Sequence, residues 1–252
     1  MGTGYTPGMF VWRELATHDT AAAKAFYGTL FGWSTQAVDM GAFEYTLLLV
    51  GERQVGGLMP ILPEMPPHAH WSSYVSVEDV DAAAARASAA GGQVVHGPHD
   101  IAGVGRIATT LDPQGAVLHL FRNAMTDPPE ERMPPVGVFV WEHLSTSDLA
   151  AAKAYYGAVL GWSGGRGAQN STDVFMVGEK YAASVNQSPA GAPSAWVTHV
   201  HVADVEASLA LAASLGAKVL MPVMPVPGMG RTAVIADPQG AAIALFTADQ
   251  GV

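Results

Sequence analysis

The first quarter of the chain alternates short apolar runs with one alanine-rich stretch, a pattern that predicts a strand, a helix and two more strands. Phe10 to Leu15 has the composition of a short strand. Asp19 stands where a helix N-cap is expected, and the run from Thr20 to Thr29 has high helix propensity because of its alanines. Gly28 and Gly32 are expected to end this helix. The two strands that follow are expected at Glu44 to Val50 and at Val55 to Met59.

The same order of elements begins again at residue 71. A strand from Trp71 to Val77 is followed by a cap at Glu78-Asp79 and by a helix from Val80 to Ala90. Gly91 and Gly92 stand at the C-terminal end of this helix, as is typical of helix ends. Two strands joined by an Asp-Pro-Gln-Gly turn then close the half, at Arg106 to Leu111 and at Ala116 to Arg122.

The second half of the chain repeats the first. Trp12 to Ser34 and Trp141 to Ser163 are identical at fourteen of twenty-three positions. Later matches, such as the two Asp-Pro-Gln-Gly turns, lie 125 residues apart instead of 129, so the second half lacks four residues between Gly164 and Pro193. A segment rich in proline and charge separates the halves and is typical of a linker. We therefore expect a first domain at residues 1–125, a linker at 126–137 and a second domain at 138–252.

The phrases D-x6-FYG-x3-GW and G-x-G-R-x5-DPQG, with the order of elements, resemble vicinal oxygen chelate domains (glyoxalase, bleomycin-resistance and extradiol-dioxygenase proteins), and they recur over nearly the whole chain. The resemblance implies an α+β fold of two tandem domains. In each, paired βαβββ modules curl their sheet into a cup that holds the ligand. The superfamily includes metal-dependent lyases, isomerases and dioxygenases as well as metal-free proteins that sequester drugs, so it predicts the fold better than the function.

Composition and charge exclude some classes of partner and of metal ligand. The formal net charge is -10 and is shared evenly by the halves, which makes nucleic acid a poor partner. No apolar run approaches the roughly 18 residues of a membrane span, and no secretory leader opens the sequence, so we expect a cytoplasmic protein without membrane contact. There is no cysteine, so a metal could be held only by His, Asp or Glu. Whether the chain forms a homodimer is left open.

Side chains alternate between the two faces of a strand, and this alternation assigns residues to the cup. On the strand from Trp71 to Val77 the apolar positions suit the face packed against helices. The other face then carries Ser72, Tyr74 and Ser76 in the first half, and Val197, His199 and His201 in the second. On the closing strand His119 faces the cup, and its counterpart is Ala244.

The resemblance also implies where a metal would bind. Metal-dependent relatives draw one ligand from the first strand, one from the strand that opens the second module, and a glutamate from the closing strand. The matching positions hold Trp12, Ser72 and His119 in the first half, and Trp141, Val197 and Ala244 in the second. Because an indole cannot donate a lone pair to a metal, we expect no cofactor. A displaced divalent metal, held by His143, His199 and His201, is the alternative.

Without a metal the cup is an aromatic wall with a few polar groups, which suits flat ligands because ring stacking adds ~0.5–1.5 kcal/mol per pair. The leading hypothesis is a metal-free protein that binds a small aromatic or polycyclic molecule, as in the bleomycin-resistance branch, with antibiotic self-resistance as its role. The predicted pocket residues are Trp12, Glu14, Tyr74, His119, Trp141, His143, His199 and His201.

Two other functions stay open. The chain could be a lyase, isomerase, dioxygenase or hydroxylase, with a displaced metal or with Glu14 or a histidine moving a proton. One half could also be a scaffold that completes the cup of the other. The sequence favours a binding protein over an enzyme.

Overall fold

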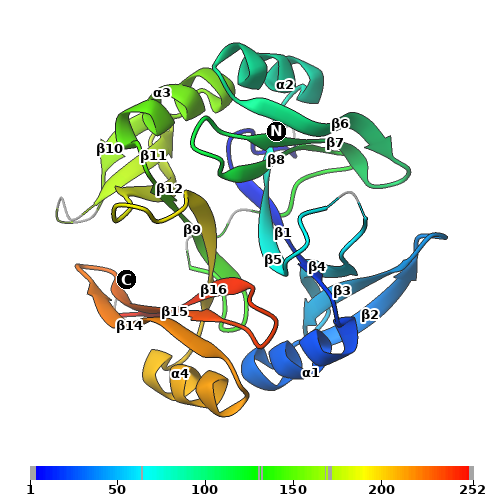
Figure 1. Ribbon diagram of the computed structural model, residues 1–252, viewed down its shortest axis with the longest axis vertical. Coiled ribbons are helices and arrows are strands. Elements are labelled where there is room, and N and C mark those ends of the chain that lie inside the picture. Colours follow the sequence, from blue (N-terminus) through cyan, green and yellow to red (C-terminus); the bar gives the residue numbers. More distant parts are fainter. Residues whose placement is uncertain are drawn as a thin grey trace. The chain divides into compact units, whose positions relative to one another are not determined.

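The computed structural model describes residues 4–63, 65–129, 131, 133–167, 169 and 172–249. In this part of the chain a strand, a helix and three strands follow one another four times (Figure 1). The first half comprises β1 (Phe10–Thr17), α1 (Thr20–Phe31), β2 (Ser34–Asp39), β3 (Glu44–Val50), β4 (Arg53–Pro60), β5 (His70–Ser76), α2 (Val80–Ala89), β6 (Gln93–Ile101), β7 (Gly105–Leu111) and β8 (Val117–Asn123).

The second half repeats this order. Its elements are β9 (Phe139–Thr146), α3 (Leu149–Leu160), β10 (Ser163–Arg166), β11 (Asp173–Val177), β12 (Lys180–Gln187), β13 (Ala195–His201), α4 (Val205–Ser214), β14 (Lys218–Val226), β15 (Gly230–Ala236) and β16 (Ala242–Ala248). Two of the four missing residues fall in the β10–β11 hairpin. The other two fall in the loop before β13.

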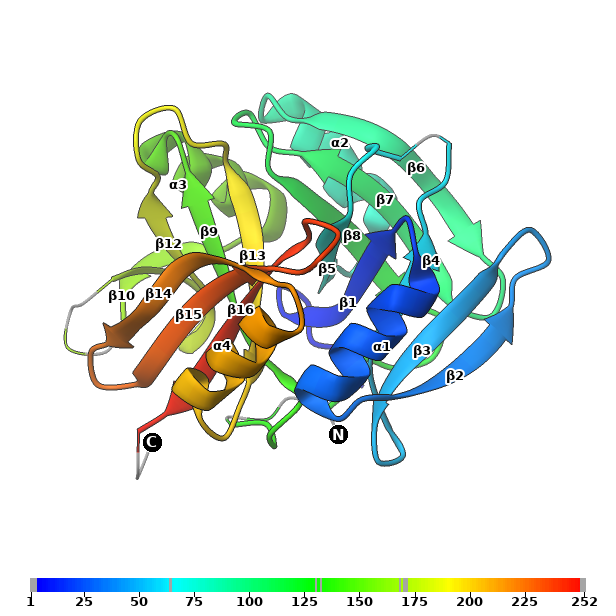
Figure 2. The same ribbon diagram turned by 60° about the horizontal axis from the view of Figure 1, so that its bottom comes forward.

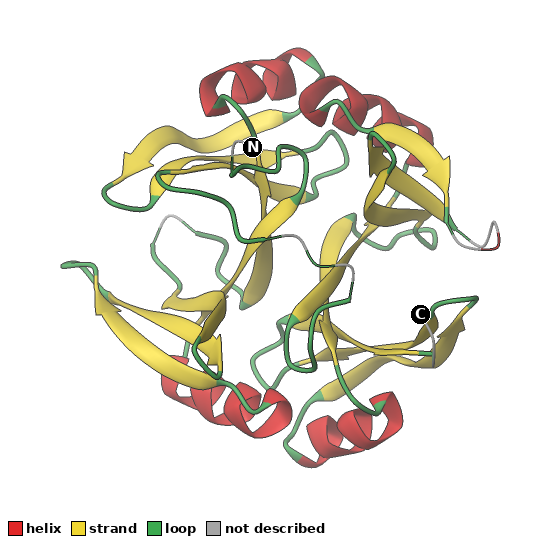
Figure 3. Cartoon of the chain, turned by 180° about the vertical axis from the view of Figure 1, so that it is seen from behind, coloured by secondary structure: helices red, strands yellow, loops and turns green. Residues whose placement is uncertain are grey.

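Each half of the sequence forms one eight-stranded mixed sheet. The strand orders are β2-β3-β4-β1-β5-β8-β7-β6 and β10-β11-β12-β9-β13-β16-β15-β14. β1 runs parallel to β4 and β5 parallel to β8, whereas neighbours joined by hairpins are antiparallel. The helices cover one face of the strands (Figure 3). The predicted α+β fold of paired βαβββ modules is confirmed.

Aspartate caps begin all four described α-helices, as predicted for the first two. The Asp19 carboxylate accepts the Ala22 backbone N–H at 2.9 Å, and Asp79, Asp148 and Asp204 act in the same way. Gly32 ends α1 in the left-handed conformation, with φ 71°. The expectation that Gly28 also ends the helix is wrong, because Gly28 lies inside α1 and its carbonyl accepts the Gly32 N–H. Among the described residues, no helix combines the length and apolar character that crossing a membrane requires.

The hydrophobic periodicity of the sequence does not indicate the outermost strands. β2 and β6 stand at the two ends of the first sheet, and β10 and β14 at the ends of the second. Most side chains of β2 and β6 are not buried, so these strands lack the alternation that half-buried strands show. Their pairing with β3 and β7 holds them in place.

Packing groups the chain into two compact units, each of which combines modules from both halves. Unit 1 is Met1–Val11, Ser73–Glu131 and Glu142–Trp196, and unit 2 is Trp12–Ser72, Arg132–Trp141 and Val197–Val252. In unit 1, α2 and α3 lie side by side, and in unit 2 α1 lies beside α4 (Figures 1 and 2). The sheets therefore follow the two halves of the sequence, whereas the buried cores do not. The domain boundaries drawn from the sequence stay a prediction.

A buried hydrogen-bonded chain links the two repeated motifs within each unit. In unit 2 the Trp71 indole donates to Tyr27 Oη at 2.9 Å, and Tyr27 donates to Asp237 Oδ2 at 2.9 Å. In unit 1 Trp196, Tyr156 and Asp112 repeat this arrangement. The tyrosine of each FYG or YYG motif thus binds the aspartate of the Asp-Pro-Gln-Gly turn from the other half of the sequence.

The segment predicted as a linker has neither helix nor strand in residues 126–129, 131 and 133–137. The Asp127 carboxylate of this segment forms hydrogen bonds with other residues of unit 1. Asp127 Oδ2 accepts the Thr6 backbone N–H at 2.7 Å and the Ser76 hydroxyl at 2.6 Å.

Candidate functional site

The first strand carries a hydrogen-bonded chain on the face of the sheet opposite the helices, called here the helix-free face. Trp12 and Glu14 share this face of β1, while Leu15 points into the core. Trp12 Nε1 donates to Tyr45 Oη at 3.0 Å, and Tyr45 donates to Glu14 Oε2 at 2.8 Å. Burial and the Glu14 charge hold the pKa of Tyr45 well above its usual value, so the phenol stays protonated and donates. The result is an aromatic surface that ends in one carboxylate.

A glycine on β4 makes room for Tyr45. Gly57 is the partner of Glu14 in the parallel β1–β4 register. A Cβ atom at Gly57 would lie 1.7 Å from Tyr45 Oη and 2.3 Å from Tyr45 Cζ. Any side chain at position 57 would therefore displace the phenol from its position between Trp12 and Glu14.

The second half has a different polar group at the same place. His143 is the counterpart of Glu14, and it pairs with Ser184 in the parallel β9–β12 register. His143 Nε2 lies 2.9 Å from Asn186 Oδ1, which can only accept, so Nε2 carries the proton. Nδ1 then accepts the Ser184 hydroxyl at 2.7 Å. The matched faces thus differ, with a carboxylate in the first half and an imidazole in the second.

Burial lowers the pKa of His143 below its usual value, and the hydrogen bond to Asn186 opposes this shift. We expect Asn186→Leu to lower the pKa of His143 further, measured by NMR titration of the ring. Because the unfolded state binds this proton more tightly, wild-type stability should fall as pH drops from about 6.5 through the lower folded pKa. Thermal unfolding against pH checks the sign. A wild-type pKa at or above 6.5 would contradict the buried neutral imidazole.

A third cluster lies on β5, β7 and β8 in unit 1. Tyr74 and His119 are paired in the β5–β8 register, and their rings stack with centroids 4.4 Å apart and an interplanar angle of 26°. His119 Nδ1 also lies 2.9 Å from Thr109 Oγ1, which fixes the ring. In the β13–β16 register of the second half, the matching pair is His199 and Ala244. Because alanine has no ring, this stack belongs to the first half.

The structure places some of the predicted pocket residues in common clusters. Trp12 with Glu14 and Tyr74 with His119 form the clusters above, and His143 forms its own. Trp141 is half-buried on β9, and His199 is buried on β13. His201 donates from Nδ1 to the Pro134 carbonyl at 2.7 Å, which ties it to the segment before β9. The assignment of these residues to a ligand pocket stays a prediction.

Sequence reasoning missed the partners that hold these residues. They are Tyr45, Gly57, Thr109, Ser184 and Asn186. Alternation along β3, β4 and β12 could have placed several of them on the helix-free face. It could not have shown which side chains meet, because contacts between strands depend on register.

The residues at the positions implied for a metal triad do not fit a metal. Trp12, at the implied first position, is a hydrogen-bond donor. In the displaced alternative, both ring nitrogens of His143 are engaged by neighbouring side chains. Across the part of the chain that the structure describes, no group of three or more His, Asp or Glu side chains could hold a metal ion. The alternative site of His143, His199 and His201 therefore gains no support from the geometry.

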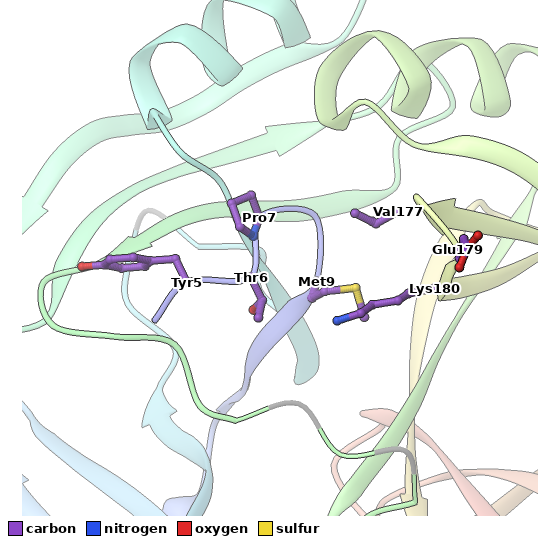
Figure 4. Close-up of a pocket in the computed structure, with 7 residues that line it drawn as sticks. All are labelled: Tyr5, Thr6, Pro7, Met9, Val177, Glu179 and Lys180. Carbon is purple, nitrogen blue, oxygen red and sulfur yellow. The ribbon is translucent and has the colours of Figure 1, made fainter. Parts of the chain in front are cut away.

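A pocket outside the predicted site opens on the surface of unit 1 (Figure 4). Its volume is about 450 Å³. One wall is the segment that leads into β1, and the other is the end of β11 with the turn into β12. The lining residues are Tyr5, Thr6, Pro7, Met9, Val177, Glu179 and Lys180.

Both halves match known families. Residues 10–120 match the Glyoxalase/Bleomycin resistance protein/Dioxygenase superfamily, and residues 142–246 match the Glyoxalase-like domain. "Putative glyoxylase CFP32" of Mycobacterium tuberculosis is 32% identical over 247 residues, with 94% of each chain covered. "Anthracycline biosynthesis protein DnrV" of Streptomyces peucetius is 31% identical over 268 residues, which cover 99% of this chain and 96% of that protein.

Solved structures share the fold at lower identity. The Mn(II)-bound glyoxalase from Novosphingobium aromaticivorans has a TM-score of 0.64 at 14% identity, with 96% of this chain and 82% of that chain covered. The 2,3-dioxygenase LapB from Pseudomonas sp. KL28 has a TM-score of 0.65 at 12% identity, with 97% and 93% covered. At such identities the likeness concerns the fold alone.

Proposed function

Because the chain belongs to the glyoxalase/bleomycin resistance protein/dioxygenase superfamily, as two tandem domains, we propose that it is a metal-free binding protein for a polycyclic aromatic small molecule. The observation that carries the proposal is the pair of hydrogen bonds from Trp12 to Tyr45 and from Tyr45 to Glu14. Where the resemblance implies a first metal ligand, the sheet instead presents an indole. The indole N–H is already bonded to a phenol, so the ring is held in a fixed orientation.

Such a surface suits a flat ligand that also carries a hydrogen-bond donor or a positive charge. Ring stacking adds ~0.5–1.5 kcal/mol per aromatic pair beyond the area buried. The Glu14 carboxylate, held by the Tyr45 hydroxyl, would orient the ligand by accepting from its polar edge. The overall charge of -10 favours cations over anions near the protein.

The relatives support the same class of ligand. Two of them, DnrV and DauV, are named for anthracycline biosynthesis, and they are 31% and 30% identical to this chain. Anthracyclines are fused-ring aromatic molecules of the kind that stack on indole. A protein that holds such a molecule away from its target would confer self-resistance.

Acid–base catalysis on the same ligand is the second candidate. A carboxylate fixed by a phenol, as Glu14 is by Tyr45, has the geometry of a positioned general base. The names of the relatives also include a glyoxylase and biosynthetic proteins. In this function the ligand would be recovered altered, whereas a sequestering protein returns it unchanged.

Titration with doxorubicin, an anthracycline, tests the proposal. Binding is measured from the change in ligand absorbance, with protein that has been treated with a chelator. We expect wild type to bind and Trp12→Ala to bind at least about tenfold more weakly, since a lost stacking surface costs about 1.4 kcal/mol. Mass spectrometry of the recovered ligand separates binding from catalysis.

Two variants control for unspecific effects. Trp12→Phe keeps an aromatic ring but loses the N–H, so it should retain most of the affinity. Val104→Ala changes an exposed side chain in the β6–β7 turn and should leave binding unchanged. The proposal fails if neither doxorubicin nor 1,4-dihydroxyanthraquinone binds, or if binding disappears with the chelator and returns with a divalent metal.

A further inference from the structure

Two histidines meet on β6, the outermost strand of the first sheet, away from the site described above. His96 is exposed and His99 is partly buried. Residues three apart on a regular strand point to opposite faces. Here the β6–β7 register shifts twice, once between Val94 and His96 and again between His96 and His99. Each shift adds a residue to β6, and the two imidazoles come together as a result.

The separation of the rings is that of two imidazoles bound to one metal ion. The ring centroids of His96 and His99 lie 4.6 Å apart, with an interplanar angle of 78°. A metal about 2.0–2.1 Å from a ring nitrogen lies about 3.2 Å from that ring's centroid. Two such rings would be about 4.5 Å apart at a right angle around the metal and about 5.2 Å apart at a tetrahedral angle. The observed separation falls within this interval.

We propose that His96 and His99 form a binding site for one divalent transition-metal ion of the copper and zinc class, with the remaining positions filled by water or a small ligand. Imidazole nitrogen is a preferred donor for these ions. Two protein ligands leave part of the coordination sphere open, so the bound ion is exchangeable.

The surroundings of His99 fit a role as ligand. Among the groups that the structure describes, none forms a hydrogen bond with the buried Nδ1 of His99. A Cβ atom at Gly97 would lie 3.1 Å from this nitrogen, so any side chain at position 97 would crowd it. His96 is exposed and its ring can turn to admit an ion. A coordinated cation would satisfy a nitrogen that otherwise costs about 1–3 kcal/mol to bury.

The charges nearby also permit a cation. Arg106 is the neighbouring positive group, and it is paired with two carboxylates. Its Nε lies 2.6 Å from Asp81 Oδ2, and its Nη1 lies 3.1 Å from Asp100 Oδ1. These three groups together carry one net negative charge, so the two carboxylates offset the repulsion between Arg106 and the ion.

The second half provides a natural comparison. β14 occupies the place of β6 and has register shifts at the matching positions, but it carries Met221 and Met224 there. The fold therefore does not need histidines at these positions. His96→Met and His99→Met install the side chains that stand at the matching register positions of β14.

The test uses full-length, untagged protein, treated with a chelator and then given one equivalent of Cu²⁺. We expect competition titration to show that His96→Met and His99→Met each weaken binding about tenfold or more. Electron paramagnetic resonance should show coupling to two imidazole nitrogens in wild type and the loss of this signal in the double variant. Circular dichroism checks that each variant is folded.

Two further variants make the outcome decisive. His68→Ala with His70→Ala removes another pair of neighbouring histidines and should leave the tight site unchanged. Met221→His, Pro222→Gly, Val223→Pro and Met224→His together transfer the whole His-Gly-Pro-His segment to β14 and should raise the number of tightly bound Cu²⁺ ions by one. The site is disproved if the double methionine variant on β6 binds Cu²⁺ with wild-type affinity and spectrum.

Discussion

Gly57→Ser is expected to lower the melting temperature by about 6–12 °C. It should also break the hydrogen bonds that join Trp12 to Tyr45 and Tyr45 to Glu14. The new Cβ atom would lie 1.7 Å from Tyr45 Oη, so the phenol must leave its place. Overpacking of this kind costs typically 1–3 kcal/mol, and Glu14 also loses a hydrogen bond worth about 1.5–3 kcal/mol. The lower end of the combined cost, about 3 kcal/mol, corresponds to the expected shift for a protein of this size. Thermal unfolding followed by circular dichroism measures it.

The second half shows how the loss can be compensated. Ser184 stands at the position that matches Gly57, and Thr172 at the position that matches Tyr45. Gly57→Ser combined with Tyr45→Thr should therefore recover most of the stability that Gly57→Ser loses. Tyr45→Thr alone should be destabilised because Glu14 loses the hydrogen bond from the Tyr45 hydroxyl.

These variants form a double-mutant cycle. We expect the double variant to be more stable than the sum of the single losses predicts, by about 0.5–3 kcal/mol, the range for residues in contact. Additive losses would mean that Tyr45 does not lie against position 57. Doxorubicin binding by the double variant then tests whether the hydrogen bonds among Trp12, Tyr45 and Glu14 contribute to ligand binding as well as to stability.

Asp237→Ala should have a comparable effect on stability through a different cause. The Asp237 carboxylate accepts the hydroxyl of Tyr27, which is fully buried, and the backbone N–H groups of Gln239 and Ala241. Removing it leaves two buried donors and one part-buried donor without this acceptor, at about 1–3 kcal/mol for each buried donor before relaxation. We expect a net loss of about 3–5 kcal/mol and a fall in melting temperature of about 10 °C or more.

Two controls separate the buried network from the turn itself. Tyr27→Phe removes only the hydroxyl and should cost less than Asp237→Ala, because the turn keeps its two backbone bonds. Asp39→Ala removes an aspartate that caps an exposed turn through the Gly41 N–H and should cost about 0.5–2 kcal/mol. Asp112→Ala in unit 1 should behave like Asp237→Ala. Equal losses of stability for Asp39→Ala and Asp237→Ala would contradict a special role for the buried hydrogen bonds among Trp71, Tyr27 and Asp237.

Local patterns were sufficient for much of the fold. The caps Asp19 and Asp79, the helices that follow them and the strands with clear alternation are encoded within a few residues of sequence. Alternation on β1 was also enough to place Trp12 and Glu14 on one face. The repeat then carried these predictions to the second half, including the exchange of Glu14 for His143.

Contacts between distant segments could not be obtained in this way. Tyr45 is 31 residues from Glu14, and its approach depends on the β3–β4 register and on the absence of a side chain at Gly57. Ser184 and Asn186 reach His143 across a parallel pair of strands, 41 and 43 residues away in sequence.

The sequence by itself determined the duplication, the order of most helices and strands, and the shared face of Trp12 and Glu14 on β1, because these follow from repeats and from the geometry of single strands and helices. Tertiary structure alone decided which modules share a core, which donors hold Glu14 and His143, and that bulges on β6 bring His96 and His99 together. The physical reason is that strand register and core packing are set by the fit of side chains far apart in the chain.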